Sequence, residues 1–233
     1  SEKGFVSYVC INFLTKIIFL IMKNRIIFAL FLVFSSSLIV AQEKQEIISK
    51  MTEEVTYLAS DKLEGRATGT ASEELAARYI ASKFKEYGVS PKGEDDYFQY
   101  FEAKLKENPH SQKIKKEITG INVVGYIDNH EKETIIIGAH YDHLGYGEFG
   151  SLYDGEKEIH NGADDNASGV SIMVNLAKSL RGITDYNYLF IAFSGEEHGL
   201  FGSSYYAKNP TINLDEARFM INFDMVGRLN KER

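Results

Sequence analysis

Four short stretches of the chain place histidine and carboxylate side chains at the ends of strongly apolar runs. The stretches are residues 138–143 (GAHYDH), 161–169 (NGADDNASG), 194–198 (SGEEH) and 222–227 (NFDMVG). Histidine, aspartate and glutamate are side chains that zinc takes as ligands from proteins. Their recurrence at the ends of apolar runs favours a hydrolytic metal site.

The first stretch contains His140 and Asp142, two residues apart. Taken alone, such a pair is more often a surface histidine beside a carboxylate than a metal site. A histidine that binds a metal usually donates its other ring N–H to an acceptor, and Asp142 is placed for that role on the same strand face. The pair therefore indicates a metal site only together with the other stretches.

Asp164 and Asp165 lie in a loop of small and polar residues before an expected helix, and Asp224 interrupts an apolar strand. An ordinary turn with helix-capping residues is the alternative for the loop. A capping or ion-pairing role is the alternative for Asp224, because a buried aspartate is unfavourable unless it is paired or bound to metal. Metal binding is favoured for both because other ligand types end the neighbouring strands.

Glu196 and Glu197 are adjacent and follow an apolar run directly. Two like charges at the mouth of a buried sheet are unfavourable unless a cation or a proton compensates them. Because successive side chains diverge, one glutamate can bind metal while the other acts on a water molecule as general base. A solvated acidic loop is the alternative.

The elements around these residues indicate an α/β protein. Three short runs are apolar on both faces and rich in β-branched and aromatic residues, namely 134–139, 188–193 and 219–223. Strands of this kind lie inside a sheet that helices cover on both sides. Helices are predicted over about 44–60, after a capping box at residues 70–73, and over about 168–180. The sheet is predicted to be largely parallel, so its strand ends bring the four stretches to one edge.

In this order and at this spacing, the four stretches resemble those of family twenty-eight of the metallopeptidases, the secreted co-catalytic dizinc aminopeptidases. Residues 63–70 (LEGRATGT) and the helix after them are similar to the family's N-terminal region, so the resemblance runs from about residue 46 to the end. It implies a mixed, mainly parallel central sheet flanked by helices on both faces, as in zinc exopeptidases. It also implies an enzyme that hydrolyses N-terminal bonds of peptides with a free N-terminus.

Carried over position by position, the resemblance implies that four residues hold two zinc ions. His140 and Asp224 bind one zinc, Glu197 binds the other, and Asp165 bridges both. Asp142 is implied to orient His140.

The resemblance also implies that Glu196 is the general base, which takes a proton from a metal-bound water to leave a hydroxide bridging the metals and later protonates the leaving amine. Two rival functions stay open. One is a glutaminyl cyclase, similar in fold but working with a single zinc; the pair His140 and Asp224 favours the peptidase. The other is a non-catalytic binding domain of the same fold, against which the intact Glu196 argues.

One ligand of the family has no counterpart in this sequence. The family's second zinc takes a further histidine from a block near the C-terminus, and no histidine follows His198 here. His143, His160 and His198 are poor substitutes because they lie within or next to stretches already assigned. We therefore expect that the chain ends before that block, or that the second zinc site is defective, and that this chain alone is close to inactive.

The first 41 residues are predicted to lie outside the catalytic domain. A basic start at residues 22–25 and an apolar run after it are typical of a signal peptide over 22–41. A membrane anchor is the alternative, but only about 16 residues separate Arg25 from Gln42, against the ~20 apolar residues that a span needs. Residues 1–21 are interpreted as spurious upstream translation, and 42–233 as the N-terminal part of a zinc aminopeptidase domain. The protein is expected to be exported, either to the periplasm or outside the cell, with membrane contact only through the signal peptide.

The composition limits the kinds of binding partner and the residue types that could hold a metal. Without the four basic residues and one acidic residue of 1–41, the chain keeps 22 basic and 32 acidic residues, a net charge of −10. This charge argues against nucleic acid as a partner. The single cysteine, Cys10, lies in the leader, which leaves histidine, aspartate and glutamate to hold any metal.

Overall fold

The computed structural model of this protein describes residues 44–106, 114–148, 150–153 and 155–228, together with residues 23 and 42. Contacts divide the chain into two units, Ser1–Ser49 and Lys50–Arg233. In the first unit, residues 44–49 are helical. Apart from residue 23, the proposed leader falls outside the described residues, so the signal peptide and the export of the protein stay predictions. No helix of the described part is both long and apolar enough to cross a membrane.

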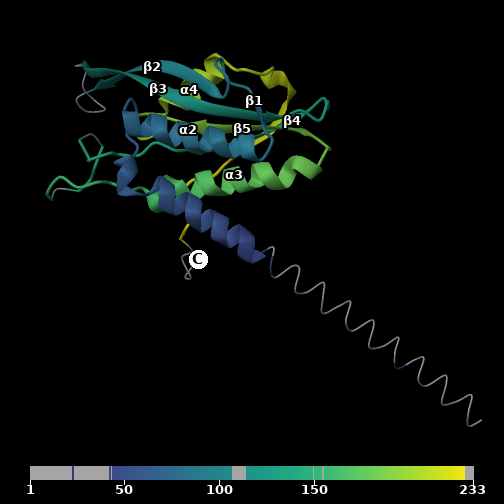
Figure 1. Ribbon diagram of the computed structural model, residues 1–233. Helices are drawn as coiled ribbons and strands as arrows, with labels where there is room; N and C mark the ends of the chain where they lie inside the picture. The colour runs from purple at the N-terminus through teal and green to yellow at the C-terminus, as the bar shows by residue number, and fades with distance from the viewer. Residues whose placement is uncertain are drawn as a thin grey trace, which may run out of the picture. The chain divides into compact units, whose positions relative to one another are not determined.

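A six-stranded mixed sheet forms the centre of the second unit (Figure 1). Its strands are β1 (Ser90–Pro91), β2 (Phe98–Lys106), β3 (Ile114–Ile127), β4 (Thr134–His140), β5 (Asn187–Phe193) and β6 (Ala217–Asn222). The order is β1-β3-β5-β4-β6, and β2 also pairs with β3. β4 runs parallel to β5 and to β6, whereas β3 is antiparallel to β1, β2 and β5.

The α/β class and the mixed sheet are confirmed, and the three predicted strands appear as β4, β5 and β6. The sheet is less parallel than expected, because β1, β2 and β3 come from a part of the chain where the sequence analysis named no strand. Charged residues of β2 and β3, such as Lys104 and Glu117, pair with each other in solvent, so these strands lack the continuous apolar run that marked the other three.

Helices cover both faces of the sheet (Figure 1). They are α2 (Ala71–Glu86), α3 (Gly169–Ser179) and α4 (Phe201–Lys208). α2 and α3 lie on one face, where Phe84, Met173 and Phe190 belong to the main apolar core. On the face of α4, Leu189 packs in a second core with Tyr206. β5 is therefore buried on both faces, and each fully buried Leu or Phe side chain stabilises the fold by about 1.5–3 kcal/mol.

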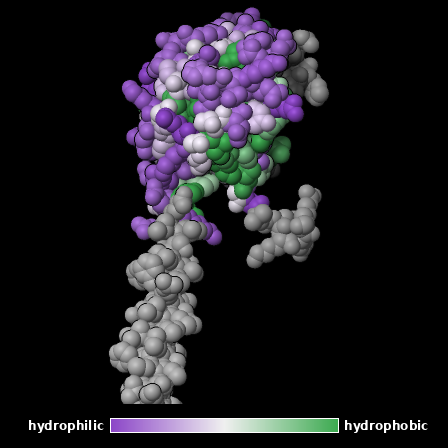
Figure 2. All heavy atoms as spheres, turned by 90° about the vertical axis from the view of Figure 1, so that its right-hand side faces the viewer, coloured by the Kyte–Doolittle hydropathy of each residue, from purple (hydrophilic) through white to green (hydrophobic). Residues whose placement is uncertain are grey.

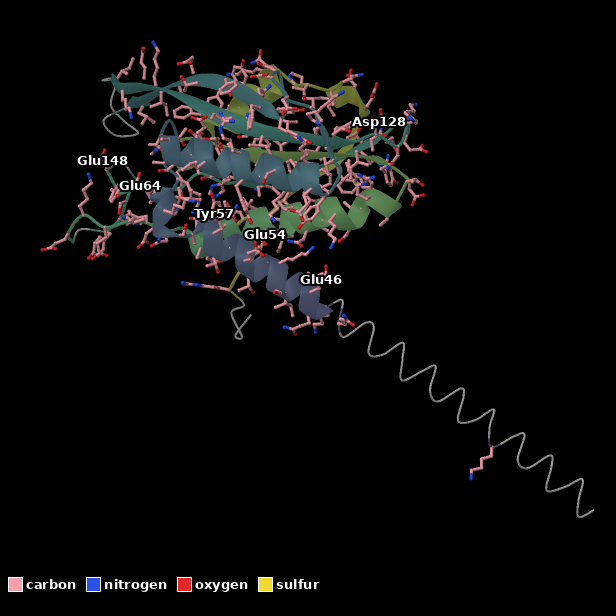
Figure 3. The ribbon with its side chains drawn as sticks, in the orientation of Figure 1. Glu46, Glu54, Tyr57, Glu64, Asp128 and Glu148 are labelled. Atoms are coloured by element: carbon pink, nitrogen blue, oxygen red, sulfur yellow. The ribbon has the colours of Figure 1, made fainter. Side chains whose placement is uncertain are left out.

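Helical residues 50–58 pack on α3 through a buried carboxylate (Figure 3). Glu54 is 2% exposed and accepts hydrogen bonds from Ser171 Oγ at 2.6 Å and from Asn175 Nδ2 at 2.7 Å. Burial raises the pKa of Glu54 above its ordinary value. The end of this helix, at Leu58, is fixed in the core and leads into the segment 63–70 singled out in the sequence.

β6 forms an apolar edge of the sheet. Its partner on one side is β4, and Phe219, Met220 and Ile221 are 48%, 48% and 42% exposed. Figure 2 shows an area of the surface where apolar residues gather. The strand lies directly before Asp224, so this edge borders the candidate metal ligands.

The start of α2 shows the predicted capping box in altered form. Thr70 Oγ1 accepts from Glu73 N at 3.2 Å, as the pattern predicts. The Glu73 carboxylate instead accepts from Gly69 N at 2.5 Å and from Ile121 N at 3.1 Å, and also from the Ser194 hydroxyl. Glu73 is 1% exposed, and burial raises its pKa to about 7 although these hydrogen bonds lower it.

Replacing Glu73 with glutamine is expected to remove a pH dependence of stability. A carboxyl group whose pKa rises from 4.5 to about 7 on folding contributes stability that is complete below the unfolded pKa and is lost as the pH rises through the folded pKa. The loss is on the order of 3 kcal/mol, because one pKa unit corresponds to about 1.4 kcal/mol. Urea denaturation across this pH range would measure it as a falling difference in unfolding free energy between wild type and variant. A difference that stays constant with pH would contradict this account.

Candidate metal centre

The parallel strands carry the candidate ligands to one edge of the sheet. His140 ends β4, Glu197 follows the end of β5, and Asp224 follows the end of β6. Asp165 comes from the short helical turn Ala163–Ser168 that leads into α3. Because β4 is parallel to both neighbours, the carboxyl ends of the three strands lie together, where sites of open α/β sheets form.

His140, Asp165 and Asp224 meet in one cluster. His140 Nε2 lies 3.1 Å from Asp165 Oδ1 and 3.4 Å from Asp224 Oδ1. The three potential ligand atoms lie within 4.8 Å of one another. The His140 side chain is 3% exposed, whereas those of Asp165 and Asp224 are 34% and 45% exposed. The cluster therefore has a rigid buried side and an open side that a substrate can approach.

A second cluster shares Asp165 with the first. It joins His143, Asp165 and Glu197, again with one ligand atom from each within 4.8 Å of the others. His143 Nδ1 lies 2.5 Å from Glu197 Oε1. The structure thus brings Glu197 to Asp165, as the family resemblance implied, and adds His143, which the sequence analysis had set aside.

The position of His143 depends on how the chain leaves β4. In a continuing strand, residues an odd number apart point to opposite faces, so His140 and His143 would diverge. The strand ends at His140, and His143 N donates to Arg66 O at 3.3 Å. The turn that follows lets both histidines reach the same edge, and no local pattern showed this.

The Asp142 side chain links the turn that carries Glu196 and Glu197 to the end of β4. This residue is fully buried, and its carboxylate accepts from Glu196 N at 3.1 Å, from Glu197 N at 3.4 Å and from Thr68 Oγ1 at 3.1 Å. His140 Nδ1 lies 3.2 Å from the Asp142 carbonyl oxygen and 3.6 Å from its Oδ1. Asp142 therefore contacts His140 through both its carbonyl and its carboxylate, and the same side chain positions both glutamates.

Glu196 stands apart from both clusters of potential ligands in the described part of the chain. Burial raises the pKa of its carboxyl; the charge of His140 lowers it, while those of Asp142 and Glu197 raise it further, and the net direction is upward. A carboxylate with a raised pKa is better matched to accepting and returning a proton near neutral pH. Position and environment thus separate Glu196 from its neighbour Glu197.

Negative charge dominates the electrostatics of the cluster around His140. Burial lowers the pKa of His140, but hydrogen bonds with Asp142 and Asp165 outweigh it, so the pKa rises to about 11. The hydrogen bond with His140 in turn lowers the pKa of Asp165. A divalent cation placed among these groups would be strongly favoured and would displace the proton from the ring.

Asn166, which the sequence analysis did not single out, joins three of the ligand segments. It is fully buried. Its Nδ2 donates to His140 O at 3.2 Å and to Phe223 O at 2.9 Å, and its Oδ1 accepts from Met225 N at 3.2 Å. One sequence feature could have indicated this role. Asn166 directly follows Asp165 in a loop, where backbone N–H and C=O groups need hydrogen-bond partners. Asn166 ties the Asp165 turn to the ends of β4 and β6.

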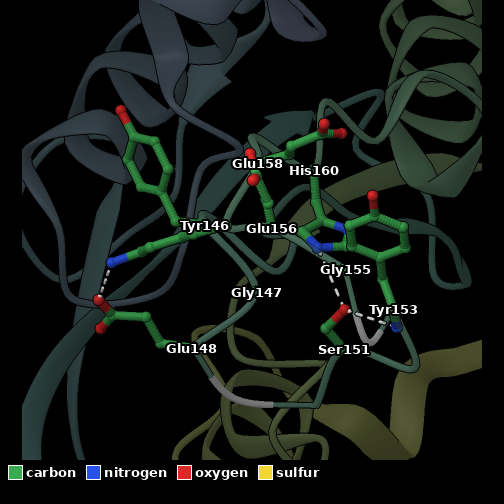
Figure 4. Close-up of a pocket in the computed structure, with 10 residues that line it drawn as sticks. Tyr146, Gly147, Glu148, Ser151, Tyr153, Gly155, Glu156, Glu158 and His160 are labelled. Atoms are coloured by element: carbon green, nitrogen blue, oxygen red, sulfur yellow. Dashed lines mark hydrogen bonds and ion pairs between the residues drawn. The ribbon is translucent and has the colours of Figure 1, made fainter.

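A pocket of about 230 Å³ lies next to the second cluster (Figure 4). His160 is one of the residues that line it, and His160 Nε2 forms a hydrogen bond with Ser151 Oγ at 3.1 Å. The His160 ring lies edge-on to the His143 ring, with 6.3 Å between centroids. Across the pocket, Lys157 Nζ lies 2.5 Å from Glu148 Oε1. The metal centre is thus bordered by a polar hollow.

Comparison with known proteins identifies the part of the chain that carries the clusters. Residues 122–233 match the model of peptidase family M28. Over these residues the chain is similar to that family. The match includes His140, Asp165, Glu197 and Asp224, so these candidate ligands all lie in the matched region.

Two relatives are similar to this chain over 60% of its length. The chain is 31% identical over 146 residues to the alkaline phosphatase isozyme conversion protein of Escherichia coli (strain K12), covering 60% of this chain and 40% of that protein. It is 30% identical over 142 residues to aminopeptidase YwaD of Bacillus subtilis (strain 168), covering 60% and 28%. The chain therefore spans well under two thirds of the length of these relatives.

Solved structures confirm the fold. A Zn-dependent exopeptidase from Parabacteroides distasonis superposes with a TM-score of 0.62 at 22% identity, over 78% of this chain and 62% of that one. A glutaminyl cyclase from Bacteroides thetaiotaomicron superposes with a TM-score of 0.60 at 22% identity, over 77% and 62%. At this identity the likeness is one of fold alone.

Proposed function

We propose that the protein to which this chain belongs is a zinc-dependent aminopeptidase. The observation that carries the proposal is the pair of ligand clusters that share Asp165, with Glu196 beside them and outside both. Each cluster offers one imidazole and two carboxylates, which is the ligand number and type of catalytic zinc sites. The donor set therefore fits zinc.

His140, Asp165 and Asp224 would hold one ion, and His143, Asp165 and Glu197 a second. Bound zinc supplies a water of lowered pKa and polarises the scissile carbonyl. Glu196 accepts a proton at its carboxylate and returns it to the leaving amine, as its raised pKa favours. Asp142 holds the Glu196 backbone in place for this transfer.

The substrate class follows from the charge at the rim. Asp165, Glu196 and Asp224 are partly or well exposed to solvent, and they would attract the protonated α-amine of a peptide N-terminus. An acidic rim of this kind favours cleavage at the N-terminal bond over cleavage inside a chain. Aminopeptidase YwaD, to which the chain is similar, has a name that agrees with this choice.

A glutaminyl cyclase is the second candidate, favoured by the likeness in fold to the Bacteroides thetaiotaomicron enzyme. Such an enzyme forms a lactam from an N-terminal glutamine and leaves other N-termini unchanged. The second cluster around Glu197 argues for the peptidase, because a single zinc would leave its carboxylates uncompensated.

The whole protein is expected to hydrolyse aminoacyl arylamides and to lose this activity in a strong chelator, with zinc restoring it. The reason is that the described part of the chain gathers metal ligands and a general base at the site. Release of the arylamine, followed by absorbance, measures the activity. Glutaminyl peptides assayed in parallel separate the rival: lactam formation without arylamine release would establish the cyclase, and turnover unaffected by the chelator would refute both.

A further inference from the structure

Arg66 is a fully buried arginine beside the metal centre that takes no part in the proposed reaction. It lies in the stretch 63–70 that the sequence analysis matched only to the family's N-terminal region. No salt bridge to Arg66 occurs among the described residues; its guanidinium instead donates to backbone carbonyls. Nε donates to Tyr141 O at 2.8 Å, and Nη2 to Gly162 O at 3.0 Å. Nη1 donates to Asn161 O at 2.7 Å and also to Leu58 O.

These acceptors belong to the segments that carry the ligands. Tyr141 lies between His140 and Asp142 at the end of β4. Gly162 O also accepts from Ala167 N at 3.1 Å, which closes the turn that contains Asp165. One planar guanidinium thus spans the two segments that supply His140 and Asp165, with fixed directions for each donor.

The backbone of Arg66 completes the connection. Its carbonyl accepts from His143 N at 3.3 Å, and its own φ of 48° lies in the left-handed region that non-glycine residues rarely adopt. A Cβ on Gly162, whose φ is +60°, would stand 2.6 Å from Arg66 Nη2. Gly162 thus leaves room for the guanidinium, and the packing holds Arg66 in one position.

Nearby carboxylates stabilise the buried positive charge of Arg66. Burial lowers the pKa of Arg66 to about 10, and the charges of Asp142, Asp165 and Glu197 raise it. A buried guanidinium without a carboxylate in contact is costly unless nearby negative charge compensates it. The carboxylates of Asp142, Asp165 and Glu197 supply that negative charge for Arg66.

We propose that Arg66 is a positioning residue of the metal centre, which sets the separation of the β4 end and the Asp165 turn and supplies a permanent positive charge beside them. The inference rests on the proposed zinc function for the identity of the metal. It goes beyond that function because it assigns a role to a residue whose guanidinium hydrogen-bonds, among the described residues, to backbone carbonyls. Loss of the Arg66 side chain should therefore make the positions of the ligand segments less well fixed, even in the absence of substrate.

Two variants separate the geometry from the charge. Arg66→Lys keeps the positive charge but loses the planar fork of donors, and Arg66→Met keeps most of the volume and loses both. Ile80→Ala is the matched control, because Ile80 is equally buried in the main core and belongs to α2, which supplies none of the candidate ligands. It lowers stability through a cavity and leaves the ligand segments intact.

The experiment measures zinc affinity by competition with a chromophoric chelator and the visible spectrum of the Co²⁺-loaded whole protein. Arg66→Met is expected to bind zinc about 10–100-fold more weakly, as for outer-shell partners of metal ligands, and to shift the Co²⁺ spectrum. Arg66→Lys is expected to recover part of the affinity but not the spectrum. Wild-type affinity and spectrum in both Arg66 variants, or an equal loss in Ile80→Ala, would overturn the proposal.

Hydrogen exchange in metal-free protein provides an independent readout. Arg66→Met should speed exchange at the amides of His143 and Ala167 more than Ile80→Ala does, because His143 N donates to the Arg66 carbonyl and Ala167 N donates to Gly162 O, which also accepts from the Arg66 guanidinium. If wild type bound no metal, the zinc function would fail, and exchange would still decide the positioning role. Unchanged exchange at these two amides would refute that role.

Discussion

Glu196→Gln is expected to lower kcat by about 10²- to 10⁴-fold, the contribution of a positioned general base, while zinc content stays at the wild-type level. The amide cannot accept the proton, but Glu196 lies outside both ligand clusters of the described residues. Its backbone bond to Asp142 does not involve the side chain, so the turn should keep its shape. Turnover of an aminoacyl arylamide and zinc content of the dialysed protein measure the two effects.

Glu197→Gln is the matched control for this variant, since it makes the same change one residue along. Glu197 contacts His143 at 2.5 Å and belongs to the second cluster, so the variant should lose zinc together with activity. Equal loss of zinc in both variants would show that the two glutamates do not divide the work in this way.

Asp165→Asn should have the largest effect on metal binding, because Asp165 is the one residue shared by the two described clusters. Removing its charge weakens both sites, whereas Asp224→Asn or His143→Ala weakens one. We expect a loss in affinity for both ions at least as large as the ~10–100-fold seen for outer-shell partners. Isothermal titration calorimetry with zinc would measure the affinity of each of the two sites.

Asp164→Asn provides the neighbouring control. The Asp164 carboxylate accepts from Gly227 N at 2.8 Å and lies outside both clusters, so its loss should leave two equivalents of zinc bound. Binding of two ions by Asp165→Asn would refute the bridging role. A single equivalent in wild type, abolished by Asp224→Asn but not by His143→Ala, would indicate a one-zinc site and strengthen the cyclase alternative.

The strands that carry ligands were predictable from the sequence, and the rest of the sheet was not. β5 is buried on both faces, which favours apolar side chains, and the apolar run of residues 188–193 is visible in the chain. β2 and β3 pair with one another over long registers, yet Lys104 and Glu117 lie on their solvent side. Their pairing depends on contacts between distant residues that no local pattern reports.

The residues that hold the ligand segments in place could not be predicted from the sequence either. Arg66 and Asn166 both act through backbone carbonyls of segments far from them in sequence. A carbonyl has the same chemistry at every position of the chain, so such contacts leave no signature in the types of the residues that accept them. His143 was set aside for a related reason, since its place depends on a turn after β4.

The sequence by itself therefore determined which side chains end the buried strands, that these are histidine and carboxylates, and that the strands belong to an α/β sheet. Only the tertiary structure decided that Asp165 is common to two clusters, that His143 meets Glu197, and that Arg66 lies behind the ligand segments. The physical reason is that apolar periodicity and ligand chemistry are local properties. The distances between ligand atoms are fixed only when buried hydrogen bonds join segments that lie far apart along the chain.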